Sequence, residues 1–193
     1  MNMQIYLAGP DVFLREAKAL SSAKRKLCER YGFNGVSPID NIIDLSGLSK
    51  KEAALRIAQA NEELIRDCGL IIANVTPFRG PSADAGTVYE MGYARGLGRP
   101  VLAYTNDGGN LLARMTEDTN FKLTRDGSGR YEDEYQMHVE DFDCFDNLML
   151  LGAVYDGGQF RVVTKSVPNE RYYIDLEGFE ECLRLAAEIF VNR

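Results

Sequence analysis

GLIIANVTPFRGPSADAGTVYEMGYARGLGRPVLAYT, residues 69–105, is the stretch that decides the fold. It opens with a continuous apolar run over 69–75, which predicts a strand buried on both faces. After a loop, a helix is predicted over 86–97, and a second apolar run over 100–105 predicts another strand. Two buried strands joined through a helix pair in parallel, because a parallel pair needs a long crossover connection. The stretch therefore indicates an α/β fold.

The same alternation continues towards the amino terminus. Strands are predicted over 3–8 and 34–38, and helices over 12–31 and 50–66. Ser49 stands where it can cap the second of these helices, with Glu52 at the position that a capping box needs. Repeated strand and helix units of this kind imply a parallel sheet with helices on both faces.

The carboxyl-terminal part is less regular. Residues 107–143 are rich in Asp, Glu, Gly and Asn and predict a long loop, and 146–154 predict a short helix or strand. A fifth strand is predicted over 171–174 and a closing helix over 176–190. A chain of 193 residues fits one domain, so we expect a single domain over 1–193 with a doubly wound, five-stranded parallel sheet.

Charge and cysteine content exclude several classes of function. A formal net charge of -7 and a pI near 4.9 oppose binding to a phosphate backbone, so nucleic acid is not expected as a partner. His138 is the only histidine, and the cysteines show no CxxC pair, so neither a metal site nor a cofactor is expected. No basic leader precedes the first strand, and no apolar run approaches the roughly 18 residues of a membrane span. We expect a soluble cytoplasmic protein with reduced thiols and no membrane contact.

Candidate functional residues gather where parallel strands end. Ligands of open parallel sheets bind beyond the carboxyl ends of the strands, and Tyr6, the loop over 76–85 and Glu90 all fall there. Glu90 lies in a helix otherwise rich in Gly, Ala, Val, Tyr and Leu, so its carboxylate must find solvent or donors in a pocket. A solvent-facing helix glutamate, and an Asp84 that only caps the helix, are the plain alternatives. Two carboxylates at one strand-to-helix junction favour a site.

Three segments of the chain resemble the nucleoside 2-deoxyribosyltransferase family. They are YLAGP (6–10), ANVTPFRGPSADAGTVYEMGYARGLGRPV (73–101) and DNLML (146–150). The resemblance implies a flavodoxin-like sheet and a ping-pong transfer of 2-deoxyribose between nucleobases. Deoxynucleosides and free nucleobases are then the expected partners.

The resemblance also implies roles for particular residues. Glu90 matches the nucleophile, Tyr6 the hydroxyl that orients it, and Asp84 the carboxylate that holds the sugar hydroxyls. Asn147 resembles an asparagine that reaches into a neighbouring subunit's site, which implies a homo-oligomer. Asn61 stands near the place of an aspartate that contacts the base in relatives, and an amide cannot donate a titratable proton. The expected substrate contacts are Gly9, Asp11, Phe13, Asn61, Phe78, Gly86, Asn147 and Met149, with Phe13, Phe78 and Met149 as walls for the base.

Two other functions remain open from the sequence. A related activity is hydrolysis of deoxynucleoside 5'-monophosphates, but a carboxylate at Asp84 would repel a phosphate dianion and favours a free 5'-hydroxyl. A non-catalytic nucleotide-binding module is the second alternative, because open sheets also bind ligands without chemistry. No GxGxxG or GxxxxGK[ST] motif follows a strand, so a dinucleotide or P-loop site is not expected.

Overall fold

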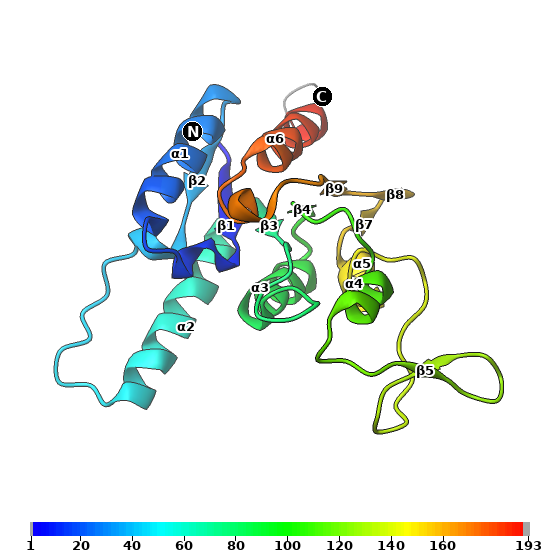
Figure 1. The fold of residues 1–193 in the computed structure, drawn as a ribbon. Helices are drawn as coiled ribbons and strands as arrows, with labels where there is room; N and C mark the ends of the chain where they lie inside the picture. The colour runs from blue at the N-terminus through cyan, green and yellow to red at the C-terminus, as the bar shows by residue number, and fades with distance from the viewer. Residues whose placement is uncertain (1, 191–193) are drawn as a thin grey trace.

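Five parallel strands form the central sheet of the computed structural model, which describes residues 2–190 (Figure 1). Their order is β2-β1-β3-β4-β9, which is the flavodoxin-like strand order and confirms the predicted fold class. The strands are β1 (Gln4–Ala8), β2 (Asn34–Val36), β3 (Leu70–Asn74), β4 (Val101–Thr105) and β9 (Val162–Thr164).

Helices cover both faces of the sheet (Figure 1). Side chains of successive strand residues point to opposite faces, so Ile5 and Leu7 pack with one cluster of helices and Tyr6 and Ala8 with the other. The first face carries α1 (Ala17–Arg30) and α6 (Glu177–Phe190), and the second carries α2 (Lys50–Asp67), α3 (Ala85–Gly96) and α5 (Leu148–Ala153).

Local sequence signals set the helix starts on the second face. The capping box predicted at the start of α2 is present, with Ser49 accepting from the Glu52 backbone and Glu52 accepting from the Ser49 backbone. Asp84 caps α3 by accepting a hydrogen bond from the backbone N–H of Thr87 at 2.9 Å. Helix α3 therefore begins directly beyond the carboxyl end of β3, where the site was expected.

The fifth strand of the sheet is β9, so the prediction of a strand over 171–174 is wrong. That segment follows a short 3-10 helix, η3 (Asn169–Arg171). The hydroxyls of Tyr172 and Tyr173 donate to the loops that follow β4 and β3, so these aromatic residues anchor a connection instead of forming a strand. The β-branched residues of β9 pair with β4 directly after a small hairpin.

Other elements refine the predicted boundaries. Helix α1 begins later than the predicted start at residue 12, because Pro10–Phe13 forms the 3-10 helix η1. The loop predicted over 107–143 contains a helix and a short hairpin. The small elements are η2 (Pro38–Asp40), α4 (Leu111–Glu117), β5 (Thr124–Arg125), β6 (Tyr131–Glu132), β7 (Tyr155–Asp156) and β8 (Gln159–Phe160). Within residues 2–190, none of the helices combines the length and the apolar character that a bilayer crossing requires.

Candidate active site

A cavity of about 300 Å³ opens beside β1 and the start of α3. Its volume is at the lower end of the range typical of small-molecule sites. Three parts of the chain supply its walls: the segment after β1, helix α2 with the segment after β2, and the first two turns of α3. The lining residues are Gly9, Val12, Phe13, Pro38, Ile39, Ile57, Asn61, Asp84, Gly86, Thr87 and Glu90.

Glu90 and Tyr6 form a hydrogen-bonded pair at this cavity. The Tyr6 hydroxyl donates to Glu90 Oε1 at 2.5 Å, and Tyr6 itself is 0% exposed. Tyr6 reaches α3 because its side chain leaves β1 on the face that α3 covers. The carboxylate is thus held in one orientation by the Tyr6 hydroxyl.

The surroundings make Glu90 a weaker acid. Burial raises its pKa to about 7, the Tyr6 hydrogen bond works in the opposite direction, and the nearby carboxylates of Asp84 and Asp11 add to the rise. Burial and the charge of Glu90 raise the pKa of the Tyr6 hydroxyl far above its usual range, so Tyr6 stays a proton donor in the hydrogen bond. Glu90 therefore changes its charge near neutral pH, which is suited to a group that takes part in chemistry.

One face of α3 presents the acidic end of the cavity. Gly86 and Glu90 are four residues apart and share that face, with Thr87 beside them. One Asp84 oxygen, Oδ2, accepts from both the backbone N–H and the hydroxyl of Thr87, at 2.9 and 3.1 Å. The capping role and a role in substrate binding are compatible, because a carboxylate has a second oxygen that can face the cavity.

An aromatic stack borders the cavity at η1. The rings of Phe13 and Phe78 are stacked with centroids 5.4 Å apart, and the Arg79 guanidinium lies 4.6 Å from the Phe78 centroid. Phe13 lines the cavity and is 59% exposed, so it can cover a ligand, whereas Phe78 supports Phe13 from outside the lining. Phe78 was expected to be a wall, and the structure places it behind one.

Asp11 also lies outside the lining. Its carboxylate turns away to a buried ion pair with Lys24, 2.6 Å from Oδ2 to Nζ, and accepts from Asn74 Nδ2 at 3.2 Å. Gly9 makes this arrangement possible, since a Cβ there would lie 2.4 Å from Asp11 Oδ1 and 2.7 Å from Asn74 Cβ. The glycine is therefore required by a close approach as well as by its φ of 155°.

Asn61 lines the cavity from α2 with an unsatisfied acceptor. Its Oδ1 atom is buried and has no hydrogen-bond partner among the described residues. A buried acceptor without a donor is costly, and a ligand N–H or O–H would remove that cost. Asn61 is thus equipped to accept a hydrogen bond from a ligand, in agreement with its expected position near the base.

Asn147 and Met149 do not reach the cavity of their own chain. Asn147 caps α5 and donates from Nδ2 to Glu140 Oε1 at 2.5 Å, and Met149 is 71% exposed on the surface. The preceding Asp146 is fully buried and accepts from Ser82 and from the backbone of Ala83, so it anchors the loop that leads into α3. Asp146 therefore supports the site without touching the cavity.

Five lining residues were not expected from the sequence: Val12, Pro38, Ile39, Ile57 and Thr87. Thr87 and Ile57 each carry a usable signal, since they lie three residues before Glu90 and four before Asn61 on the same helix faces. Pro38 and Ile39 follow β2, so they could have been predicted from the rule that strand ends meet at one edge of the sheet.

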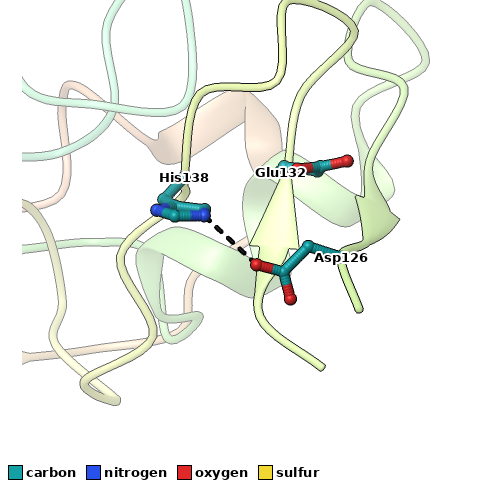
Figure 2. A group of neighbouring side chains, drawn as sticks. All are labelled: Asp126, Glu132 and His138. Atoms are coloured by element: carbon teal, nitrogen blue, oxygen red, sulfur yellow. Dashed lines mark hydrogen bonds and ion pairs between the residues drawn. The ribbon is translucent and has the colours of Figure 1, made fainter. Parts of the chain in front are cut away.

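A second group of polar side chains lies at the β5–β6 hairpin and the segment that follows it (Figure 2). Ligand-type atoms of Asp126, Glu132 and His138 lie within 4.8 Å of one another, although their spacing in the sequence gave no metal pattern. The Asp126 carboxylate already accepts from Ser128 and pairs with Arg130 at 3.3 Å. That guanidinium would oppose a cation at the same oxygen, so we interpret the group as part of the hairpin's own hydrogen bonding.

A flavodoxin-like sheet whose carboxyl edge bears a partly buried carboxylate, hydrogen-bonded by a tyrosine, is the architecture of a small-molecule α/β protein with an acidic pocket. Comparison with known proteins narrows this class. A sequence model described as nucleoside 2-deoxyribosyltransferase matches residues 5–149, and the chain belongs to that family. The resemblance seen in the sequence is thereby confirmed.

Three individual proteins are similar to this chain. A 2-deoxyribosyltransferase from Leishmania mexicana is similar in structure, with a TM-score of 0.63 and 26% sequence identity over 94% of this chain and 97% of its own. A conserved protein from Enterococcus faecalis shares the fold, with a TM-score of 0.55 and 22% identity over 96% of this chain and 99% of its own. An uncharacterized protein of Schizosaccharomyces pombe is 29% identical over 84% of this chain and 82% of its own length.

Proposed function

We propose that the protein transfers 2-deoxyribose between nucleobases by a ping-pong mechanism through a covalent deoxyribosyl ester on Glu90. The observation that carries the proposal is the Tyr6 to Glu90 hydrogen bond at the cavity. It fixes a carboxylate whose pKa is raised to about 7 by burial, which a mere surface glutamate would not show. Similarity to the 2-deoxyribosyltransferase of Leishmania mexicana supports the same reaction class.

The first half-reaction breaks the glycosidic bond. A Glu90 oxygen attacks C1', the C1'–N bond breaks with its electron pair going to the base, and the base nitrogen takes up a proton. Positive charge develops on the sugar as the base leaves, and an adjacent carboxylate stabilises this charge before it forms the ester. In the second half-reaction a nitrogen of another base attacks C1', the ester bond breaks, and Glu90 is released as a carboxylate. The incoming nitrogen gives up its proton, which replaces the proton taken up by the first base.

Two neutral groups suit the base end of the pocket. The Phe13 ring can stack on a base, and the free Oδ1 of Asn61 can accept an N–H of that base. Asn61 cannot transfer a proton to the leaving nitrogen, because an amide does not titrate in this range. Asn61 is therefore proposed to orient the base, and the proton for the leaving nitrogen comes from another donor.

Hydrolysis of deoxynucleoside 5'-monophosphates is the second candidate. The charge of the cavity argues against it, since Asp84 and Glu90 both line a space that a phosphate dianion would have to enter. Arg79 is the nearby cation, and it lies over the rings of Phe13 and Phe78. We therefore propose that free nucleosides are the preferred substrates.

A second copy of the chain is proposed to complete the site. Leu148 and Met149 at the start of α5 are 42% and 71% exposed, and Leu55 on α2 is 59% exposed, so apolar side chains remain uncovered at both places. Asn147 would have to leave Glu140 to contact a neighbouring cavity. A homo-oligomer that buries these residues is the arrangement we propose.

Incubation with thymidine and adenine tests the proposed reaction, with deoxyadenosine and thymine as the expected products. Glu90→Ala should abolish turnover, and a 2'-fluoro nucleoside with slow turnover should label Glu90, as mapped by mass spectrometry. Release of free sugar without a new nucleoside would favour the hydrolase. A Glu90→Ala variant that keeps full ligand affinity, alongside a wild type without turnover, would favour the non-catalytic module.

A further inference from the structure

Lys24 is buried in the fold and takes no part in the reaction steps described above. It lies on α1 with its side chain 2% exposed, and its Nζ is 5.6 Å from the Tyr104 ring centroid and 5.4 Å from that of Phe179. Taking an ammonium group out of water is costly unless a partner compensates for it. The partner is Asp11, 2.6 Å away and 12% exposed.

The Lys24–Asp11 ion pair connects the two faces of the sheet. Helix α1 covers the face opposite to α3, whereas Asp11 belongs to η1, which supplies Val12 and Phe13 to the cavity wall. The cation is thus located behind the wall, outside the cavity lining. It acts on a ligand only through the residues that it holds.

The ion pair is one end of a buried hydrogen-bonded chain along the carboxyl edge of the sheet. Asn74 Nδ2 donates to Asp11, and Asn74 Oδ1 accepts from the backbone and hydroxyl of Thr76 at 3.1 and 2.6 Å. The Thr76 hydroxyl oxygen accepts from the Asn106 backbone at 3.0 Å. All three of these partners are 0% exposed, so β1, β3 and β4 fix the position of the Asp11 carboxylate at their ends.

We propose that Lys24 is a positioning residue of the site, which fixes η1 as the cavity wall and compensates the charge of Asp11 behind that wall. The inference rests on the proposed function only for its effect on turnover. Its electrostatic part concerns the charge of Glu90 and holds for any ligand.

Three groups determine the charge state of Glu90 from the elements around it. Tyr6 on β1 donates to it, Asp84 at the start of α3 repels its charge, and Asp11 on η1 repels it as well. Burial opposes the charge on Lys24 itself, but the attraction of Asp11 outweighs this and raises the Lys24 pKa, so Lys24 keeps its positive charge. With the ammonium group present, the charge of Asp11 is compensated. Without it, Asp11 would act on Glu90 as a bare like charge and raise its pKa further.

The test measures the Glu90 titration directly, by NMR of protein labelled with ¹³C at glutamate carboxyl carbons, with Glu90→Gln used to assign the signal. Lys24→Met should move the Glu90 midpoint upward by on the order of one pH unit. Asp11→Asn should move it downward, and the double variant should return it towards the wild-type midpoint. Lys24→Arg, which keeps the charge, should retain the midpoint.

Activity supplies the second readout. If wild type performs the transfer, Lys24→Met should lower kcat/KM about fivefold at pH 7 and regain most of it at pH 9, because the loss follows the protonation of Glu90. A purely structural lysine would lower the amount of folded protein and leave the midpoint unchanged. A folded Lys24→Met with the wild-type midpoint overturns the proposal.

The outcome does not depend on one fragile variant or on the proposed reaction. If Lys24→Met does not fold, Asp11→Asn provides the test. It leaves the ammonium group of Lys24 uncompensated and should lower the midpoint of the Glu90 titration; an unchanged midpoint overturns the proposal. If the wild type makes no deoxyadenosine, the proposed function fails, and the NMR midpoints still decide the role of Lys24.

Discussion

Replacing Tyr6 by phenylalanine removes one hydroxyl group from the site and leaves the aromatic ring in place. The lost interaction is the 2.5 Å hydrogen bond to Glu90 Oε1. A hydrogen bond to a charged group contributes about 1.5–3 kcal/mol, and one pKa unit corresponds to about 1.4 kcal/mol. From the wild-type value of about 7, the Glu90 pKa in Tyr6→Phe should therefore rise by roughly one to two units.

The rise has a defined effect on rate. At pH 7 the ionised fraction of Glu90 would fall from about one half to between about 1 and 10%, so kcat/KM should fall roughly 5- to 50-fold. Near pH 9 most of the loss should be regained. The assay is the initial rate of deoxyadenosine formation from thymidine and adenine at low substrate concentration, measured from pH 5 to pH 10.

The pH dependence separates two roles of the tyrosine. A wild-type profile that rises with pH and levels off above neutrality, shifted upward in Tyr6→Phe, supports control of the Glu90 charge. An equal loss at every pH, with the midpoint unchanged, would refute this reasoning and leave Tyr6 with an orienting role alone. Circular dichroism and thermal unfolding of the variant provide the control for folding.

Three further outcomes are expected. Because the Glu90 pKa is raised in the folded protein, the contribution of Glu90 to stability is complete below pH 4.5 and is lost as pH rises through about 7. Thermal unfolding should therefore show Glu90→Gln to be as stable as wild type at pH 4.5 and more stable at pH 8, by up to about 3 kcal/mol. Asp84→Asn keeps an N-cap acceptor for Thr87 but removes a charge, so the preference for thymidine over its 5'-monophosphate should narrow by on the order of tenfold; an unchanged ratio would exclude Asp84 as the discriminating charge. Mixing inactive Glu90→Ala with an inactive Asn147→Ala variant should restore part of the activity if sites are shared, and mixed protein that stays inactive would argue against shared sites.

Much of the fold followed from burial patterns that are local in the sequence. The run over 69–75 is apolar at almost every position because β3 is covered on both faces, and such a run has few alternatives to a buried strand. The segment over 171–174 is not part of such a continuous apolar run. Its tyrosines are β-formers by propensity, but their hydroxyls bind other loops, and such tertiary contacts outweigh propensity.

The site was predictable where one rule of topology applied. Strand ends meet at one edge, so Tyr6, Asp84 and Glu90 could be expected together; Asp84 and Glu90 line one cavity, and the buried Tyr6 donates a hydrogen bond to Glu90. That rule does not apply to helix α2, because the packing of α2 against α3 decides which face of α2 meets the cavity. Ile57 was therefore missed, and Asn61 came only from the family resemblance.

We expect charge at the cavity to link the rate of the proposed transfer to its choice of substrate. Glu90 and Asp84 line the space, Asp11 lies behind its wall, and Lys24 compensates only one of the three carboxylates. In the proposed reaction, the remaining negative potential would stabilise a sugar that becomes cationic as its base leaves, and the same potential would repel a 5'-phosphate. The two effects cannot be separated by changing Asp84 alone. Asp84→Asn should therefore accept monophosphates more readily and, for the same reason, transfer deoxyribose from thymidine more slowly.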